Sequence, residues 1–267
     1  MTGFAAGGND VGSEIHPEDP RDLAQRRSGN LPAGKVPTPG TMRDGVMSLR
    51  LEVPVLCGSL VRLEPLALSH AADLALAAEE DRSSYRFTMV PRAADVTEYL
   101  AAQLARAGLT PFAQVRVRDG RAVGCTSFCT PRTFAELPGL QAIEVGWTWL
   151  AGSAQGTGIN AEAKLLLFGY AFEVLGVARV DLRTDARNER SRRAIANLGA
   201  RFEGVVRSSS PSWAPGEEGT LRDSAMFSVI AAEWPAVKSA LAARAARSVA
   251  WGDEEGGEQV AVAGYPV

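Results

Sequence analysis

Residues 143–161 read IEVGWTWLAGSAQGTGINA. This stretch passes from an alternating strand pattern through a glycine-bearing turn into an uninterrupted helix pattern. The first N–H groups of a helix have no partners within the helix, and the positive end of the helix dipole lies behind them, so such a start can bind phosphate without lysine or arginine. We therefore predict an anion cradle, a corner of free backbone N–H groups, formed by Gln155, Gly156, Thr157, Gly158, Ile159, Asn160 and Ala161.

Two known motifs fit this corner. Gly156, Gly158 and Ala161 match the dinucleotide fingerprint G-x-G-x-x-[G/A], which predicts NAD(P) binding when it lies between a strand and a helix. That fingerprint normally opens the first βαβ unit, whereas several strand-like segments come earlier in this chain. The corner also resembles the [Q/R]-x-x-G-x-[G/A] acyl-coenzyme A loop of the GNAT N-acetyltransferases at Gln155 and Gly158, with Asn160 in place of the final Gly or Ala.

The segments after the corner strengthen the second resemblance. A strand pattern at residues 178–185 is followed by Asn188-Glu-Arg-Ser191, a short helix, and the stretch 198–204, LGARFEG. In the GNAT family this succession is a strand, an Asn-x-x-Ser turn, a helix and the entry to the next strand. Residues 221–228, LRDSAMFS, resemble the last strand of the RimJ/RimL-like branch. The resemblance extends over roughly residues 59 to 245 and implies an α/β GNAT fold, with a mixed, mostly antiparallel sheet between helices.

Local patterns before the corner agree with that fold. Residues 60–65 alternate as a strand, and residues 68–80 have helical spacing with Ser69 as a candidate N-cap. A second amphipathic helix is expected over residues 95–107. Strands at 112–118 and 122–130 flank Asp119-Gly120, a strong hairpin signal, and a third strand follows at 142–150. We expect a crossover helix over 162–175 with Leu166, Tyr170 and Val174 along one stripe, and a last helix over 231–247.

Composition divides the chain into three parts. Residues 1–57 are rich in Gly, Pro, Asp and Arg, and we expect them to be a disordered or wrongly assigned N-terminal extension. Residues 58–247 are the expected acetyltransferase domain, and residues 248–267 an expected disordered acidic tail. Basic and acidic residues nearly balance (28 against 31), which argues against nucleic-acid binding as the main role.

Other residue types narrow the setting. The cysteines (Cys57, Cys125 and Cys129) are too few for a disulfide framework, and no histidine lies near them to complete a metal site, so we expect free thiols in a reducing cytoplasm. No stretch has the length of a membrane span or the pattern of a secretion signal. We expect a cytoplasmic monomer or homodimer that contacts neither membranes nor nucleic acid.

The family resemblance implies roles for particular residues. Trp147, Thr148 and Trp149 occupy the strand whose backbone holds the pantetheine arm of acetyl-CoA in GNAT enzymes. Glu144 aligns with the strand that carries the general base, although it could instead be solvated or paired with an arginine. Ser191 lies where related enzymes place a hydroxyl near the thioester sulfur, and Asn188 is a candidate cofactor contact whose alternative role is capping the short helix.

The resulting hypothesis is an N-acetyltransferase that moves an acetyl group from acetyl-CoA to a primary amine by direct attack. The acceptor could be a protein N-terminus, an amino acid, a polyamine or an antibiotic. The first alternative is a noncatalytic acyl-CoA-binding module, which would bind the thioester without releasing thiol. The second is a nucleotide-dependent oxidoreductase, which would bind NAD(P) at the same glycines. No metal ion is expected in any of these sites.

Overall fold

The computed structural model describes residues 50–256, which lie within one compact unit. Its strands are β1 (Leu56–Cys57), β2 (Val61–Pro65), β3 (Leu109–Arg116), β4 (Ala122–Arg132), β5 (Ala142–Leu150), β6 (Arg179–Asp185), β7 (Arg201–Pro211) and β8 (Leu221–Ile230). Its α-helices are α2 (Ala71–Glu79), α3 (Val96–Ala105), α4 (Ile159–Gly169), α5 (Glu189–Ala196) and α6 (Trp234–Gly256). A π-helical turn, Tyr170–Val174, continues α4.

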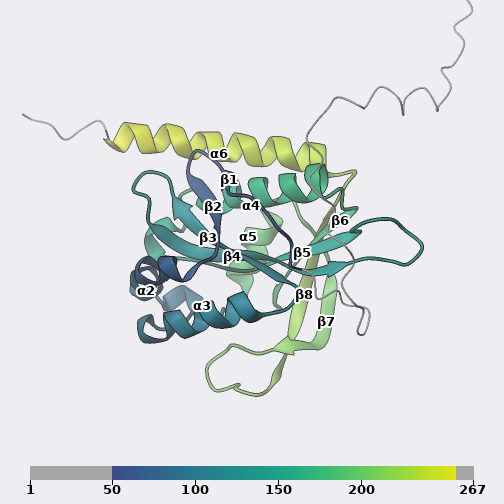
Figure 1. Cartoon of the computed structure of the whole chain (residues 1–267), viewed down its shortest axis with the longest axis horizontal. Coiled ribbons are helices and arrows are strands. Elements are labelled where there is room, and N and C mark those ends of the chain that lie inside the picture. Colours follow the sequence, from purple (N-terminus) through teal and green to yellow (C-terminus); the bar gives the residue numbers. More distant parts are fainter. Residues whose placement is uncertain (1–49, 257–267) are drawn as a thin grey trace, which may run out of the picture. The chain divides into compact units, whose positions relative to one another are not determined.

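The strands form an eight-stranded sheet in the order β1-β2-β3-β4-β5-β6-β8-β7. Among these described strands only the pair β5–β6 is parallel, because α4 connects the two as a crossover, and all other neighbours are antiparallel. Figure 1 shows α4 and α6 on one side of the sheet and α2 and α3 on the other. The predicted mixed, mostly antiparallel α/β fold is therefore confirmed.

Local chemistry accounts for the meander that leads to the site. The predicted hairpin between β3 and β4 is present, and Gly120 in its turn has φ +71°, a conformation that glycine adopts without steric cost. Near the start of β4, Gly124 lies so close to β5 that an added Cβ would be 2.1 Å from the carbonyl oxygen of Trp149. The two strands that carry the site can approach this closely only because the residue is glycine.

The start of α4 is tied to the beginning of the domain by Glu162. Its carboxylate accepts hydrogen bonds from the backbone N–H groups of Ser59, Leu60 and Val61 at 2.9, 2.6 and 2.9 Å. The residue is 6% exposed, so these bonds form away from solvent. An added Cβ on Gly58 would be 2.4 Å from the Glu162 carboxyl carbon, so a side chain there would displace the carboxylate from its three N–H donors. This anchor fixes the helix that opens at the predicted cradle.

Several predicted boundaries are corrected by the structure. Ser69 does not cap a helix, because it lies inside a short 3-10 turn, Leu68–His70, and α2 begins after it without a side-chain cap. Leu51 and Val53 are buried in the core, so the domain begins before residue 58. At the other end α6 continues to Gly256, past the expected end at residue 247. The rest of the predicted tails, residues 1–49 and 257–267, lies outside the described residues.

The buried face of α4 also differs from the predicted stripe. Val174 is 65% exposed, whereas Lys164, Leu167, Phe168 and Ala171 are buried. The four consecutive apolar residues of the run LLLF at 165–168 point to all sides of the helix, so periodicity alone does not select the face that packs on the sheet. The face that does pack on the sheet includes Lys164.

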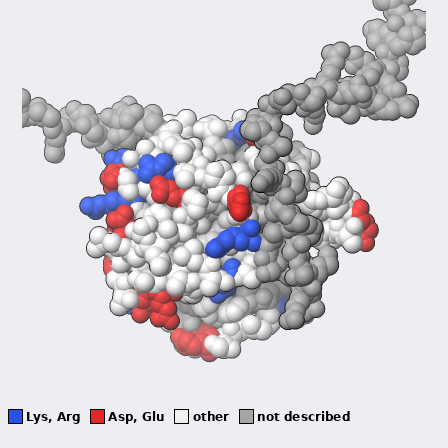
Figure 2. All heavy atoms as spheres, in the orientation of Figure 1, with Lys and Arg blue, Asp and Glu red and all other residues white. Residues whose placement is uncertain are grey.

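On the face drawn in Figure 2, acidic and basic side chains lie beside one another at the upper left and near the centre, and acidic ones lie along the lower edge. Among the described residues, no helix is both long and apolar enough to cross a membrane. The same part of the chain has no group of three or more His, Cys, Asp or Glu side chains placed to hold a metal ion. Cys125 and Cys129 are buried free thiols, and Cys57 is an exposed one.

Candidate active site

A break in the sheet opens the site. Strands β5 and β6 pair only where Ala142–Glu144 faces Arg179–Asp181, and no register pair is formed beyond Glu144. On its other edge β5 carries a bulge, since Gly146 pairs with Ser127 while Trp149 pairs with Cys125. Trp147, within the bulge, has φ +52°, a left-handed conformation that is rare for a tryptophan. A cavity of about 700 Å³ lies at this opening and reaches the start of α4.

The predicted cradle forms one wall of that cavity. Gly156 and Gly158 have φ +80° and +85°, and Gly158 is the N-cap of α4. Gln155, Gly156, Gly158, Asn160 and Ala161 line the cavity. The side chains of the other two predicted members face elsewhere: the Thr157 hydroxyl donates to the Ala154 carbonyl at 2.8 Å, and Ile159 is buried in the core. Their backbone N–H groups still belong to the helix start.

Two polar features of the cradle can interact with a ligand, one as a hydrogen-bond acceptor and one through a positive charge. The side-chain oxygen of Asn160, in the first turn of α4, is buried and has no hydrogen-bond partner in the described structure. Gln155 is held by its amide nitrogen, which donates to the Leu150 carbonyl at 2.8 Å, and its oxygen accepts from the guanidinium of Arg190. Arg190 therefore places a positive charge beside the cradle, which the glycine motif alone did not predict.

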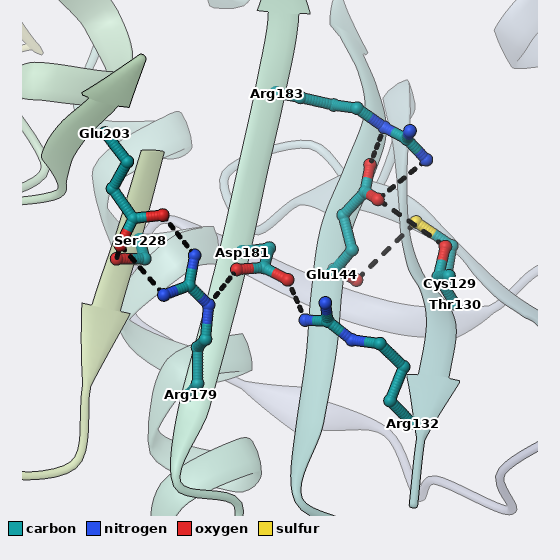
Figure 3. A network of polar contacts seen from close by, with 9 residues as sticks. All are labelled: Cys129, Thr130, Arg132, Glu144, Arg179, Asp181, Arg183, Glu203 and Ser228. Atoms are coloured by element: carbon teal, nitrogen blue, oxygen red, sulfur yellow. Dashed lines mark hydrogen bonds and ion pairs between the residues drawn. The ribbon is translucent and has the colours of Figure 1, made fainter. Parts of the chain in front are cut away.

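Glu144 lies on the cavity wall but is not a free carboxylate. Arg183 donates to both of its oxygens at 2.8 Å, as Figure 3 shows. The Thr130 hydroxyl lies 3.5 Å from one of these oxygens, and the carboxylate is about nine-tenths buried. The structure thus favours the arginine-pair interpretation of Glu144 over an available general base.

A second ion-pair group lies beneath the opening. Asp181, 4% exposed, is bound by Arg132 and Arg179, and Arg179 continues to Glu203, as Figure 3 shows. The Arg179 guanidinium and the Ser228 hydroxyl both donate hydrogen bonds to the Glu203 carboxylate, and together they lower its pKa to about 2. This group links β4, β6 and β7, so the sheet stays joined below the point where β5 and β6 separate.

Asn188 and Ser191 meet at the start of α5 on the far side of the cavity. The Asn188 side chain accepts a hydrogen bond from the Ser191 N–H at 3.0 Å, so it caps the helix as the alternative interpretation expected. Both residues also line the cavity, and their positions therefore remain compatible with cofactor contact.

Several cavity residues were not predicted from the sequence. Lys164 of α4 lines the cavity and donates to the hydroxyls of Thr126 and Thr148. The guanidinium of Arg106 lies 4.4 Å from the ring centre of Trp147, whose ring is in turn 6.2 Å from that of Trp213. The aromatic side chains of Tyr85, Phe87 and Trp149 also line the cavity, whereas the exposed Phe134 does not.

Comparison with family models identifies this architecture. Residues 61–201 match the model described as "Acetyltransferase (GNAT) domain". The chain belongs to the GNAT family of acetyltransferases. The matched span contains the bulged strand, the cradle and α5, and the family assignment makes the protein an acyltransferase enzyme.

Solved structures agree with the family. A GCN5-related N-acetyltransferase from Brucella melitensis is 28% identical, with a TM-score of 0.63 over 73% of this chain and 86% of the other. A protein from T. thermophilus, named provisionally as an acetyltransferase, is 34% identical, with a TM-score of 0.61 over 73% and 99%. Mycobacterium smegmatis RimJ in complex with CoA-disulfide, 22% identical with a TM-score of 0.55 over 71% and 90%, shows the shared fold. No curated protein sequence matches the chain.

Proposed function

We propose that this GNAT enzyme transfers an acetyl group from acetyl-CoA to a primary amine by direct attack in a ternary complex. The observation that carries the proposal is a single cavity that holds both the glycine corner at the start of α4 and the opening between β5 and β6. A helix start binds the diphosphate of the donor, and an unpaired strand edge binds its pantetheine amides. Holding both reactants in one cavity lowers the activation barrier by about 7 to 11 kcal/mol.

The donor site is assigned residue by residue. We propose that backbone N–H groups from Gln155 to Ala161 bind the diphosphate, that the Asn160 amide oxygen accepts a hydrogen bond from the bound donor, and that Arg190 adds a charge contact. The edge formed by Trp147, Thr148 and Trp149 binds the pantetheine arm. Asn188 contacts the same arm while it caps α5, and Ser191 lies near the departing sulfur. Buried free thiols agree with our proposal that the enzyme works in a reducing cytoplasm.

The charges of the cavity restrict the acceptor. Among the described residues that line it, the acidic side chain is Glu144, already paired with Arg183, and the basic ones are Arg106, Lys164, Arg183, Arg190, Arg222 and Arg244. A polyamine would bring more positive charge into this setting. We therefore propose a neutral or anionic acceptor, such as a peptide N-terminus or an amino acid, in preference to a polyamine.

Charge reversal at the cradle tests the donor site. Arg190→Glu should weaken acetyl-CoA binding about tenfold or more in calorimetric titration, because a carboxylate would then face the diphosphate. Arg193→Glu is the matched control: it lies on the same short helix, is exposed, and does not line the cavity. Equal affinities of the two variants would contradict the assignment of the diphosphate to this corner.

Thiol release tests the transfer itself. The wild-type chain is mixed with acetyl-CoA and, in turn, with an α-amino peptide, an amino acid and spermidine, and free thiol is followed. We expect amine-dependent release that is greatest with the peptide or the amino acid. Tight acetyl-CoA binding with no release for any amine would instead identify a noncatalytic binding module, and binding of NAD(P) in place of acetyl-CoA would identify an oxidoreductase.

A further inference from the structure

Lys164 is a buried lysine with no acidic partner among the described residues. It lies on the sheet-facing side of α4 and is 3% exposed. Its Nζ donates to Thr126 Oγ1 at 3.0 Å and to Thr148 Oγ1 at 2.8 Å, and the two hydroxyl oxygens are 2.9 Å apart. Burying a charge without a counter-charge is costly, so this position favours the neutral amine.

The hydroxyl partners have a chemical consequence. A carboxylate would only accept hydrogen bonds and would hold the lysine charged, whereas a hydroxyl both donates and accepts. When Nζ is charged, it donates to both threonines and the Thr148 proton can turn to the Gly146 carbonyl, 3.4 Å away. When Nζ is neutral, the Thr148 hydroxyl can donate to its lone pair. Each of these three atoms therefore keeps a hydrogen-bond partner in both protonation states.

The surroundings of Lys164 bring the pKa of its ammonium close to neutral pH, where the group can both take up and release a proton. Burial lowers the pKa of the Lys164 ammonium to about 7, and the nearby Cys129 on β4 opposes this weakly. The other titratable side chains that line the cavity are Tyr85 between α2 and α3, Arg106 beside β3, Glu144 on β5, Arg183 on β6, Arg190 on α5, Arg222 on β8 and Arg244 on α6. The Glu144 carboxylate is bound by Arg183, so it is not available to Lys164.

Thr148 connects this amine with the reaction space. It lies in β5 immediately after the bulged Trp147, on the strand edge assigned to the pantetheine arm, and it lines the cavity together with Lys164. Thr126 does not line the cavity. A proton that leaves a molecule in the cavity can therefore reach Lys164 through one hydroxyl.

We propose that Lys164, acting through the Thr148 hydroxyl, takes the proton that the acceptor amine loses and returns it to the thiolate that leaves. This inference rests on the proposed acetyl transfer. As the amine nitrogen attacks the thioester carbonyl carbon, its proton passes to Thr148 Oγ1 and the hydroxyl proton passes to Nζ. When the carbon–sulfur bond breaks, the sulfur keeps the bonding electrons, and the proton returns by the same path to give the free thiol. No other reactant is needed.

Paired substitutions test the relay. Thr148→Val removes the hydroxyl while keeping the shape, and Lys164→Arg keeps a cation that does not deprotonate. Each should lower kcat at pH 7 by about a hundredfold, the lower end of the range for proton-transfer catalysis. Thr148→Ser, which returns the hydroxyl, should recover most of the rate lost in Thr148→Val. The double variant Lys164→Arg/Thr148→Val should be no slower than either single one, because both interrupt one path.

The pH profile distinguishes the relay from a structural role. With saturating acetyl-CoA and the most active amine of the panel, the wild-type kcat should rise through an ionisation near pH 7 that is absent in Lys164→Arg, while calorimetry shows unchanged acetyl-CoA affinity. An unchanged profile, or full activity of Thr148→Val, overturns the relay and leaves the transferase intact. Mass spectrometry that finds the acetyl group on Lys164 itself also overturns it. Absence of thiol release by the wild type with every amine overturns both proposals.

Discussion

Replacement of Lys164 by methionine should change how the stability of the enzyme depends on pH. Burial lowers the pKa of the ammonium to about 7 in the folded chain, against about 10.4 in the unfolded chain. Between these values the unfolded chain binds more protons, so the contribution of Lys164 to the free energy of unfolding becomes more favourable as pH rises. Below pH 7 its destabilising effect is fully present. The substitution removes this dependence.

The expected size follows from the two pKa values. Between pH 7 and pH 9 the Lys164 contribution to the free energy of unfolding should increase by about 2 kcal/mol. Burial raises the pKa values of Cys125 and Cys129, and ionisation of these thiols in the unfolded chain lowers stability above about pH 8.5, in the opposite direction. The wild-type curve alone therefore hides the lysine effect. The difference between wild type and variant isolates it, because both chains keep the thiols.

Urea unfolding at constant ionic strength, at pH 7, 8 and 9, measures that difference. The advantage of Lys164→Met over wild type should shrink, or its deficit should grow, by about 2 kcal/mol from pH 7 to pH 9. Lys238→Met is the matched control, since Lys238 pairs with Glu173 on the surface and is half exposed. Its difference from wild type should stay within about 0.5 kcal/mol at every pH. A pH-independent difference for Lys164→Met would refute the buried neutral amine.

Three further perturbations test the rest of the framework. Glu162→Ala should lower the free energy of unfolding by about 3 kcal/mol in urea titrations, because three buried N–H groups lose their acceptor. Glu162→Gln, which keeps one acceptor oxygen, should lower it less. Equal stability of the two variants would contradict the anchoring role of Glu162. Gly124→Ala should sharply reduce the melting temperature, because its Cβ would overlap the Trp149 carbonyl, and a wild-type melting temperature would show that the strands can separate there. Glu144→Gln should lower kcat less than tenfold if the proton of the acceptor amine goes to Lys164. A loss of a hundredfold or more would identify Glu144 as the general base instead.

The fold and the glycine corner at the start of α4 were largely predictable because local rules determine them. Gly156 and Gly158 adopt positive φ values at the start of a helix. Glycine adopts this conformation without steric cost, so the two glycines in the sequence already indicate the turn. The hairpin at Asp119-Gly120 is set by turn chemistry in the same way. The order of strands and helices around these points then leaves few topologies, and the resemblance to one family selects among them.

The proton chemistry was not predictable from the same evidence. A lysine in a helix normally faces solvent, and the run LLLF beside Lys164 allows several faces of α4 to pack. Only tertiary packing decides that this lysine meets Thr126 and Thr148. The pairing of Glu144 with Arg183 also depends on long-range register, since it requires Glu144 to lie beside Asp181, two residues before the arginine. The spacing of residues within one segment predicts neither the contacts of Lys164 nor the pairing of Glu144 with Arg183.

The bulge in β5 connects these features. Two steps along β4 lead from Cys125 to Ser127, but three steps along β5 separate their partners Trp149 and Gly146, so one extra residue enters β5 there. Without it, Glu144 and Thr148 would share one face by strict alternation. With it, Thr148 contacts Lys164 of α4 while Glu144 remains with Arg183 of β6. The irregularity that leaves a strand edge open to the cavity therefore also separates the carboxylate from the hydroxyl, and the left-handed backbone of Trp147 is the local cost of both effects.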